Sequence, residues 1–84
     1  MNDTTINRIR EVLRENARLP VEVDLVPDEA DLFQAGMSSH ASVNVMLALE
    51  DAFDIEFPDH MLKRSVFGSI AGIAEAVDEL QVAA

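Results

Sequence analysis

The residues from Gly36 to Asp59 read GMSSHASVNVMLALEDAFDIEFPD. Glycine interrupts regular structure, so Gly36 indicates a break in the chain directly before a helix. Ser38 is a suitable N-cap, because its hydroxyl can accept a hydrogen bond from a free backbone N–H of the first turn. The apolar residues that follow predict a helix from Ser38 to Ala52 or Phe53. The residues assigned to its buried side are Val43, Leu47 and Leu49.

Apolar residues at three- and four-residue spacing predict two further long helices, one on each side of this stretch. The first runs from about Thr5 to Ala17 and is stopped by Pro20. The last follows Ser69, a second candidate N-cap. A short third helix is predicted over Asp59–Arg64, directly after a proline. The apolar stripes are Ile6, Ile9, Leu13 and Ala17 in the first helix and Ile70, Ile73, Val77 and Leu80 in the last.

A long connection, Arg18–Met37, joins the first two helices. Within it Val21, Val23 and Leu25 alternate with acidic residues, as in a strand. No second strand pattern occurs, so we expect a loop whose apolar residues pack onto the helices. The predicted fold is all-α: a small four-helix bundle with three long helices, a short third helix and a long first loop. A chain of 84 residues is enough for a single domain, 1–84.

The composition argues against several classes of function. The net charge of −10 repels phosphate backbones and anionic lipids, so we expect neither nucleic acid nor a membrane as a partner. Cysteine is absent and the two histidines are far apart in sequence, so groups for catalysis or metal binding are scarce. The acidic clusters lack the pattern of a calcium loop. The N-terminus does not read as a signal peptide. We therefore expect a monomeric cytoplasmic protein that is not an enzyme and has no metal site.

The charges are unevenly distributed. No lysine or arginine occurs from Leu19 to Leu62, and the part from Leu32 to Leu49 contains no acid either. Polar residues such as Gln34 and Asn44 argue against a membrane span there. A mostly buried helix and an uncharged recognition surface both account for this stretch, and the sequence leaves both open.

Gly36, Ser39, Ala48–Asp54 and Pro58–Asp59 together resemble the acyl carrier protein family. Members of that family place a modified serine after a glycine, at the start of the second helix. The resemblance implies that Ser39, rather than Ser38 or Ser42, carries a 4′-phosphopantetheine arm through a phosphodiester. A helix N-terminus also favours a phosphate. Cargo would be held as a thioester on the thiol of the arm. The neighbours assigned to the attachment site are Gly36, Ser38 and His40.

The sequence departs from the common family pattern in its charges. Ser38 replaces an aspartate, His40 replaces a leucine, and Ala41 and Asn44 occupy positions that are acidic in fatty-acid carriers. This neutral helix front resembles small carriers that a stand-alone ligase charges with an amino acid. The expected partners are a phosphopantetheinyl transferase, an acyl or aminoacyl ligase and a downstream transferase. The residues predicted to contact partners are Met37, Ala41, Val43, Asn44, Glu50 and Asp51.

Two alternatives remain beside the aminoacyl carrier. One is a specialised acyl carrier for fatty-acid, lipid or secondary-metabolite synthesis, and the other is an unmodified helical interaction module. We expect a small polar cargo that stays outside the helices, because the core of so short a chain needs its bulky side chains for itself. The side chains assigned to that role are Met46, Leu47, Ile55 and Phe57.

Overall fold

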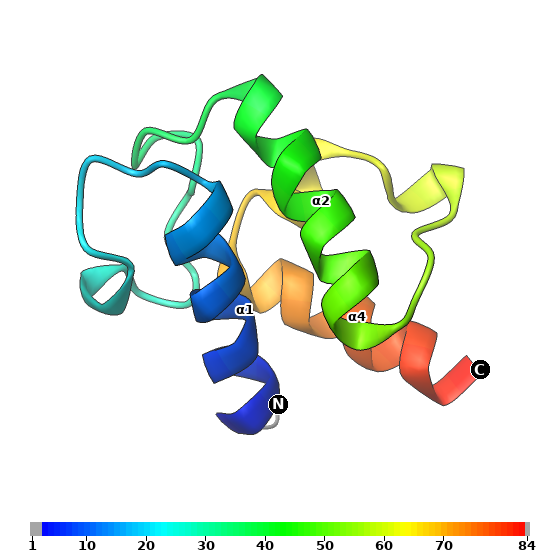
Figure 1. The fold of residues 1–84 in the computed structure, drawn as a ribbon. Helices are drawn as coiled ribbons and strands as arrows, with labels where there is room; N and C mark the ends of the chain where they lie inside the picture. The colour runs from blue at the N-terminus through cyan, green and yellow to red at the C-terminus, as the bar shows by residue number, and fades with distance from the viewer. Residues whose placement is uncertain (1–2, 84) are drawn as a thin grey trace.

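Three long helices and one short helix form the described part of the protein, residues 3–83 (Figure 1). The computed structural model describes residues 3–83, and no strand occurs among them. This confirms the all-α prediction. The elements are α1 (Asp3–Asn16), α2 (Ser39–Phe53), α3 (Arg64–Phe67) and α4 (Ile70–Ala83), with two 3₁₀ helices, η1 (Val23–Leu25) and η2 (Asp59–Met61).

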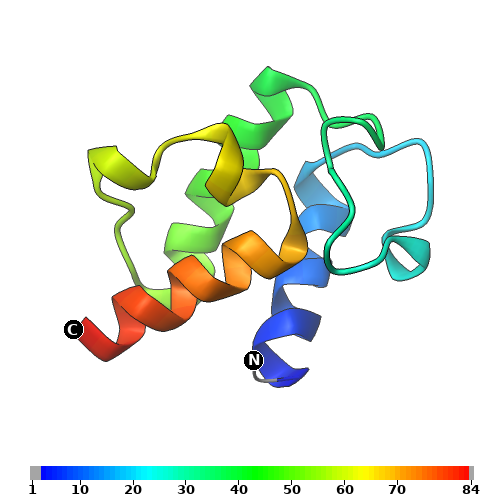
Figure 2. The same cartoon turned by 180° about the vertical axis from the view of Figure 1, so that it is seen from behind.

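The core lies where α1 packs against both α2 and α4, while α3 packs on α4 (Figure 2). The predicted stripes of α1 and α4 are confirmed: most of their residues are buried, and Ile6 and Leu80 are partly buried. Ser69 caps α4 as expected, because its Oγ accepts a hydrogen bond from the Gly72 N–H at 3.0 Å. The largest fully buried side chains are Ile9, Leu13, Leu32, Val45, Leu49, Ile70, Ile73 and Val77.

The buried face of α2 differs from the prediction. Ala41, Val45 and Leu49 form it, whereas Val43 and Leu47 are 51% and 54% exposed. Of the three predicted core residues only Leu49 is correct. Residues four apart share a helix face, so the Ala41–Val45–Leu49 row faces the neighbouring helices and places Val43 and Leu47 on another side. The small Ala41 gave no strong apolar signal from which to choose this row.

The first loop forms a 3₁₀ turn where the sequence alternates between apolar and acidic residues. Val23 and Val26 are buried, whereas Val21 and Leu25 are exposed, so the expectation that all its apolar residues pack inward is wrong. A 3₁₀ turn begins at Val23, and residues three apart share a side in such a turn. Arg10 of α1 holds this turn: its guanidinium donates to the Val23 carbonyl and to Asp28 Oδ1, both at 2.6 Å.

The third helix also lies later than predicted. The segment Asp59–Arg64 contains the 3₁₀ helix η2 and then two residues that are not helical, Leu62 and Lys63, before α3 begins at Arg64. This break allows both Met61 and Phe67 to be buried. Phe67 contacts Phe57 edge to face, with ring centroids 5.1 Å apart. A continuous helix from Asp59 would change the direction of these side chains relative to the core.

Candidate functional site

Gly36 sets the start of α2. Its φ of +123° is rarely adopted by residues with a side chain, and a Cβ placed there would lie 2.5 Å from Pro20 Cδ. The following residue, Met37, donates its N–H to the Leu32 carbonyl at 3.0 Å. Glycine is therefore required at this position to bring the chain back from the first loop into α2.

The three serines at the start of α2 have different roles. The Ser38 Oγ accepts a hydrogen bond from the Ala41 N–H at 3.0 Å, which confirms it as the N-cap. The Ser42 Oγ donates to the Ser39 carbonyl at 2.6 Å. Ser39 is exposed, and no hydrogen bond joins its hydroxyl to another group within residues 3–83. Among the three, only the Ser39 side chain is exposed and has no hydrogen bond to the part of the chain that the structure describes.

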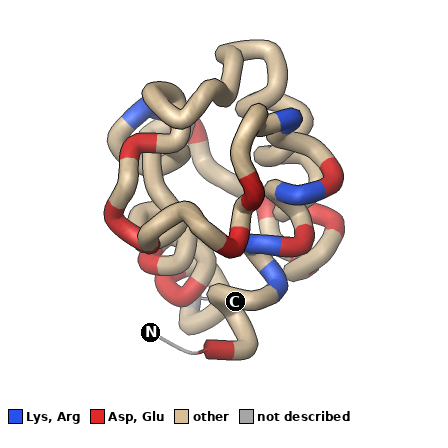
Figure 3. Tube along the Cα trace, turned by 90° about the vertical axis from the view of Figure 1, so that its left-hand side faces the viewer, with Lys and Arg blue, Asp and Glu red and all other residues tan. Residues whose placement is uncertain are grey.

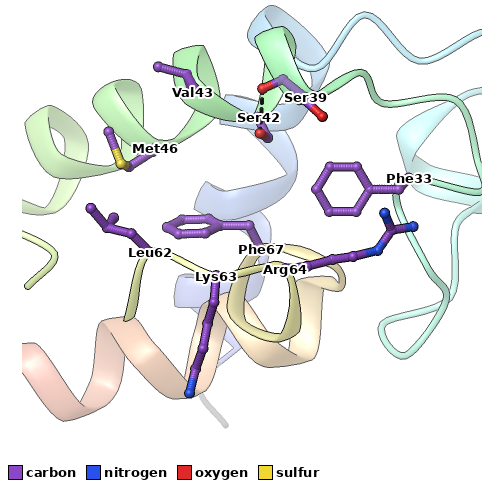
Figure 4. A pocket seen from close by; sticks show the side chains of 9 residues that line it. All are labelled: Phe33, Ser39, Ser42, Val43, Met46, Leu62, Lys63, Arg64 and Phe67. Atoms are coloured by element: carbon purple, nitrogen blue, oxygen red, sulfur yellow. Dashed lines mark hydrogen bonds between the residues drawn. The ribbon is translucent and has the colours of Figure 1, made fainter. Parts of the chain in front are cut away.

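The Ser39 side chain borders an open pocket of about 390 Å³ between the first half of α2 and the segment that leads into α3 (Figure 4). A pocket of this size can hold a small ligand or part of a flexible one. The sequence did not predict it, because its walls come from three separate segments. The lining residues are Phe33, Ser39, Ser42, Val43, Met46, Leu62, Lys63, Arg64 and Phe67.

The pocket has a local charge opposite to that of the whole protein. Its lining contains Lys63 and Arg64 but no acid, and the first turn of α2 contains no acid either. Figure 3 shows acidic residues along much of the chain, with an uncharged end at the top, where Figure 1 places the start of α2. The free N–H groups of a helix N-terminus add further positive potential. An anion attached at Ser39 would therefore lie in the least acidic part of the molecule.

Arg64 and Phe33 form one end of this pocket. The Arg64 guanidinium carbon lies 4.4 Å from the centroid of the Phe33 ring, a cation–π contact. Two backbone hydrogen bonds hold the loop beside α3 and α4: Leu32 N–H to the Gly68 carbonyl at 2.7 Å and Ala71 N–H to the Asp28 carbonyl at 2.8 Å. Arg64 is not among the site residues that the sequence predicts. The sequence does contain a signal for this residue: Lys63 and Arg64 are the first basic residues after the long stretch that has no lysine or arginine.

The predicted partner residues do not all lie on the surface. Met37 and Ala41 are 3% and 5% exposed, so they belong to the core and offer little area for contact. Glu50 is partly buried, and its Oε2 accepts the Phe57 N–H at 2.9 Å, so it also ties the following connector to α2. The residues that are exposed are Val43, Asn44 and Asp51, together with His40 beside the attachment position.

The described part of the chain contains neither a helix that could span a membrane nor a group of side chains that could hold a metal ion. No helix within residues 3–83 is long and apolar enough to cross a membrane. No group of three or more His, Cys, Asp or Glu in the same part of the chain could hold a metal ion.

The chain is similar to known carrier proteins over most of its length. A curated aminoacyl carrier protein from Agrobacterium fabrum (strain C58) is 55% identical over 69 residues, which are 82% of this chain and 83% of that protein. A chain in the crystal structure of an engineered Bradyrhizobium japonicum glycine:[carrier protein] ligase complexed with an Agrobacterium tumefaciens carrier protein and AMP is 52% identical, with a TM-score of 0.85. The match covers 87% of this chain and 97% of that one, so it is to the carrier protein.

A solution structure from Agrobacterium tumefaciens also matches, with 49% identity, a TM-score of 0.73 and coverage of 94% of this chain and 99% of the other. The family model described as a phosphopantetheine attachment site matches residues 7–77, a range that contains Ser39 and every residue that lines the pocket. On this evidence the chain belongs to the phosphopantetheine-attachment family, the carrier proteins that hold a 4′-phosphopantetheine group.

Proposed function

We propose that this protein carries an aminoacyl group as a thioester on a 4′-phosphopantetheine arm attached to Ser39. The observation that carries the proposal is the division of roles at the start of α2. Ser38 supplies the cap, Ser42 donates to the backbone, and the Ser39 hydroxyl stays exposed and free. Similarity to an aminoacyl carrier protein at 55% identity supports an amino acid as cargo.

The residues around Ser39 fit such an arm. The exposed hydroxyl is accessible to a phosphopantetheinyl transferase, and the helix N-terminus and the neighbouring bases favour the phosphodiester that results. The chain has no cysteine, so the arm supplies the thiol that holds the cargo. The protein contributes position and recognition, while its partners contribute the chemistry. It is not itself a catalyst in this proposal.

An uncharged surface beside Ser39 supports a specialised loading enzyme. Val43 and Leu47 on α2 and Leu62 before α3 are large apolar side chains that are between 46% and 54% exposed. We propose that this surface docks an amino acid:carrier protein ligase, because Val43 and Leu62 line the Ser39 pocket and Val43 and Leu47 lie in the stretch without acids. Enzymes whose basic surfaces bind acidic carrier proteins would find few acidic side chains to contact there.

The pocket itself favours a second candidate, an acyl carrier for lipid or secondary-metabolite synthesis. Val43, Met46, Leu62 and Phe67 give it apolar walls that could cover part of an acyl chain. This differs from the expectation that bulky side chains would leave no space, because Leu47 points to solvent and Met46 borders the pocket.

Intact-mass spectrometry tests the attachment site. Wild type and the variants Ser38→Ala, Ser39→Ala and Ser42→Ala are treated with a phosphopantetheinyl transferase and coenzyme A. The wild type and the two flanking variants should gain the mass of one phosphopantetheinyl group, and Ser39→Ala should gain nothing. Modification of Ser39→Ala, or a wild type that stays unmodified, would refute the proposal.

The holo protein then tests the cargo. It is offered to a glycine:carrier protein ligase with ATP and single amino acids, and in parallel to an acyl:carrier protein synthetase with fatty acids of increasing length. Thioester formation with an amino acid supports the aminoacyl carrier. Loading with fatty acids alone would establish the second candidate instead.

A further inference from the structure

We propose that Arg64 is a positioning residue for the phosphodiester on Ser39, and that the Phe33 ring holds its guanidinium ready for that role. This inference rests on the proposed attachment at Ser39 and adds residues from two segments outside α2. The three side chains line the same pocket. In Figure 4 the Ser39 hydroxyl points toward the end of the pocket where the guanidinium lies against the Phe33 ring.

The guanidinium is available for an anion. It is held over the ring at 4.4 Å, and no hydrogen bond from it to another group occurs within residues 3–83. The side chain is 68% exposed. A planar guanidinium offers several N–H donors with the geometry that suits two phosphate oxygens. Stacking on an aromatic ring reduces the number of side-chain conformations and so lowers the entropic cost of binding.

Two acids, Glu29 and Asp31, line a second cavity together with Arg64, and Asp31 pairs with it only weakly. The closest approach is 3.8 Å between Asp31 Oδ2 and Arg64 Nη2, too long for a hydrogen bond. The other carboxylate oxygen, Oδ1, accepts the Phe33 N–H at 2.9 Å and the Gln34 N–H at 3.3 Å. Asp31 therefore mainly shapes the turn that places Phe33 beside α3, and it leaves the Arg64 donors for another anion.

Lys63 is a poorer candidate although it also lines the pocket. Figure 4 shows its side chain extending away from Ser39, toward α4, and Lys63 also lines a further cavity together with Glu75 and Glu79. The remaining bases lie elsewhere, and three of them pair with acids: Arg8 with Glu11, Arg10 with Asp28 and Arg14 with Asp24. In a protein with a net charge of −10, Arg64 is the base whose charged group lies at the Ser39 end of the pocket.

Nuclear magnetic resonance of the apo and holo forms tests this role. Attachment of the arm should move the Arg64 Nε–Hε signal and leave that of Arg18, which lines a different pocket, unchanged. Salt at about 1 M should largely reverse the change, because the screening length falls to about 3 Å. In Arg64→Gln, nuclear Overhauser contacts between the arm and the Phe33 ring should weaken roughly two- to fivefold, the range for an exposed ion pair.

Matched variants separate position from net charge. Arg18→Gln removes the same charge and should leave the arm contacts at their wild-type intensity, and Arg64→Lys should restore them only in part, since a point charge stacks less well. Phe33→Leu keeps Arg64 but removes its platform, and should weaken the contacts as well. An Arg64 signal that is the same in apo and holo protein, or equal contacts in Arg64→Gln and Arg18→Gln, would overturn the inference.

Failure of this inference is distinct from failure of the proposed function. A wild type that gains the arm by mass while the Arg64 signal stays in place refutes only the role of Arg64. A wild type that gains no arm refutes the attachment at Ser39. The comparison of apo and holo wild type needs no substitution, so a folding defect in any variant leaves the test intact.

Discussion

Val43 and Val45 lie two positions apart on α2 and offer a matched test of which face of the helix is buried. Val45 is fully buried in the core, whereas Val43 is 51% exposed. The same change to alanine at both positions removes the same atoms and alters helix propensity by the same amount. We expect Val45→Ala to destabilise the protein much more than Val43→Ala.

The magnitude follows from burial. Loss of two buried carbons costs about 1.6 kcal/mol in transfer free energy, and the cavity left behind raises the total for Val45→Ala to about 2–3 kcal/mol. For the half-exposed Val43 the transfer loss is about 0.8 kcal/mol. Alanine returns about 0.5 kcal/mol of helix propensity at each site. The net losses are then about 1.5–2.5 kcal/mol for Val45→Ala and about 0.3 kcal/mol for Val43→Ala.

Urea unfolding followed by circular dichroism measures both losses, because the chain has no tryptophan or tyrosine for fluorescence. With a slope of about 1 kcal/mol per molar urea, the midpoint should fall by about 1.5–2.5 M for Val45→Ala and by less than about 0.5 M for Val43→Ala. Equal midpoints, or a larger fall for Val43→Ala, would show that the packing assigned to α2 is wrong.

Three further outcomes are expected. Gly36→Ala should lower the free energy of unfolding by about 1–3 kcal/mol, because alanine is strained at this φ and its Cβ would collide with Pro20. The same urea titration measures this loss, and an unchanged midpoint would contradict it. Leu47→Asp should slow the loading of the holo protein by the ligase, because it places a charge on the apolar docking surface. Leu25→Asp adds the same charge on the distant first loop and should not slow loading. Equal loading rates in the two variants would show that Leu47 is not part of the docking surface. In NMR spectra, an aminoacyl cargo should leave the amide signals of the pocket residues nearly unshifted, because its charged amine is well solvated and the pocket contains two bases. An octanoyl cargo should shift the amide signal of Phe67. Large shifts with the aminoacyl form would indicate that this cargo enters the pocket.

The sequence by itself determined the helical class, the limits of α2 and the N-cap of that helix at Ser38. These are local properties: a capping serine, a glycine with a special backbone angle and an apolar row repeat within a few residues, so a short window contains the signal. The stripes of α1 and α4 were predictable for the same reason, since large aliphatic residues mark one side of each helix.

Only the tertiary structure decided which side of α2 faces the core, where α3 begins and which residues surround Ser39. The α2 helix has apolar residues on more than one side, and the buried row starts with a small alanine, so the pattern alone favoured Val43 and Leu47 over Val45. The break before α3 depends on burying Met61 and Phe67 together. Arg64 joins the site because backbone hydrogen bonds place the first loop against the chain around Gly68 and Ala71, and contacts between segments so far apart leave no local pattern in the sequence.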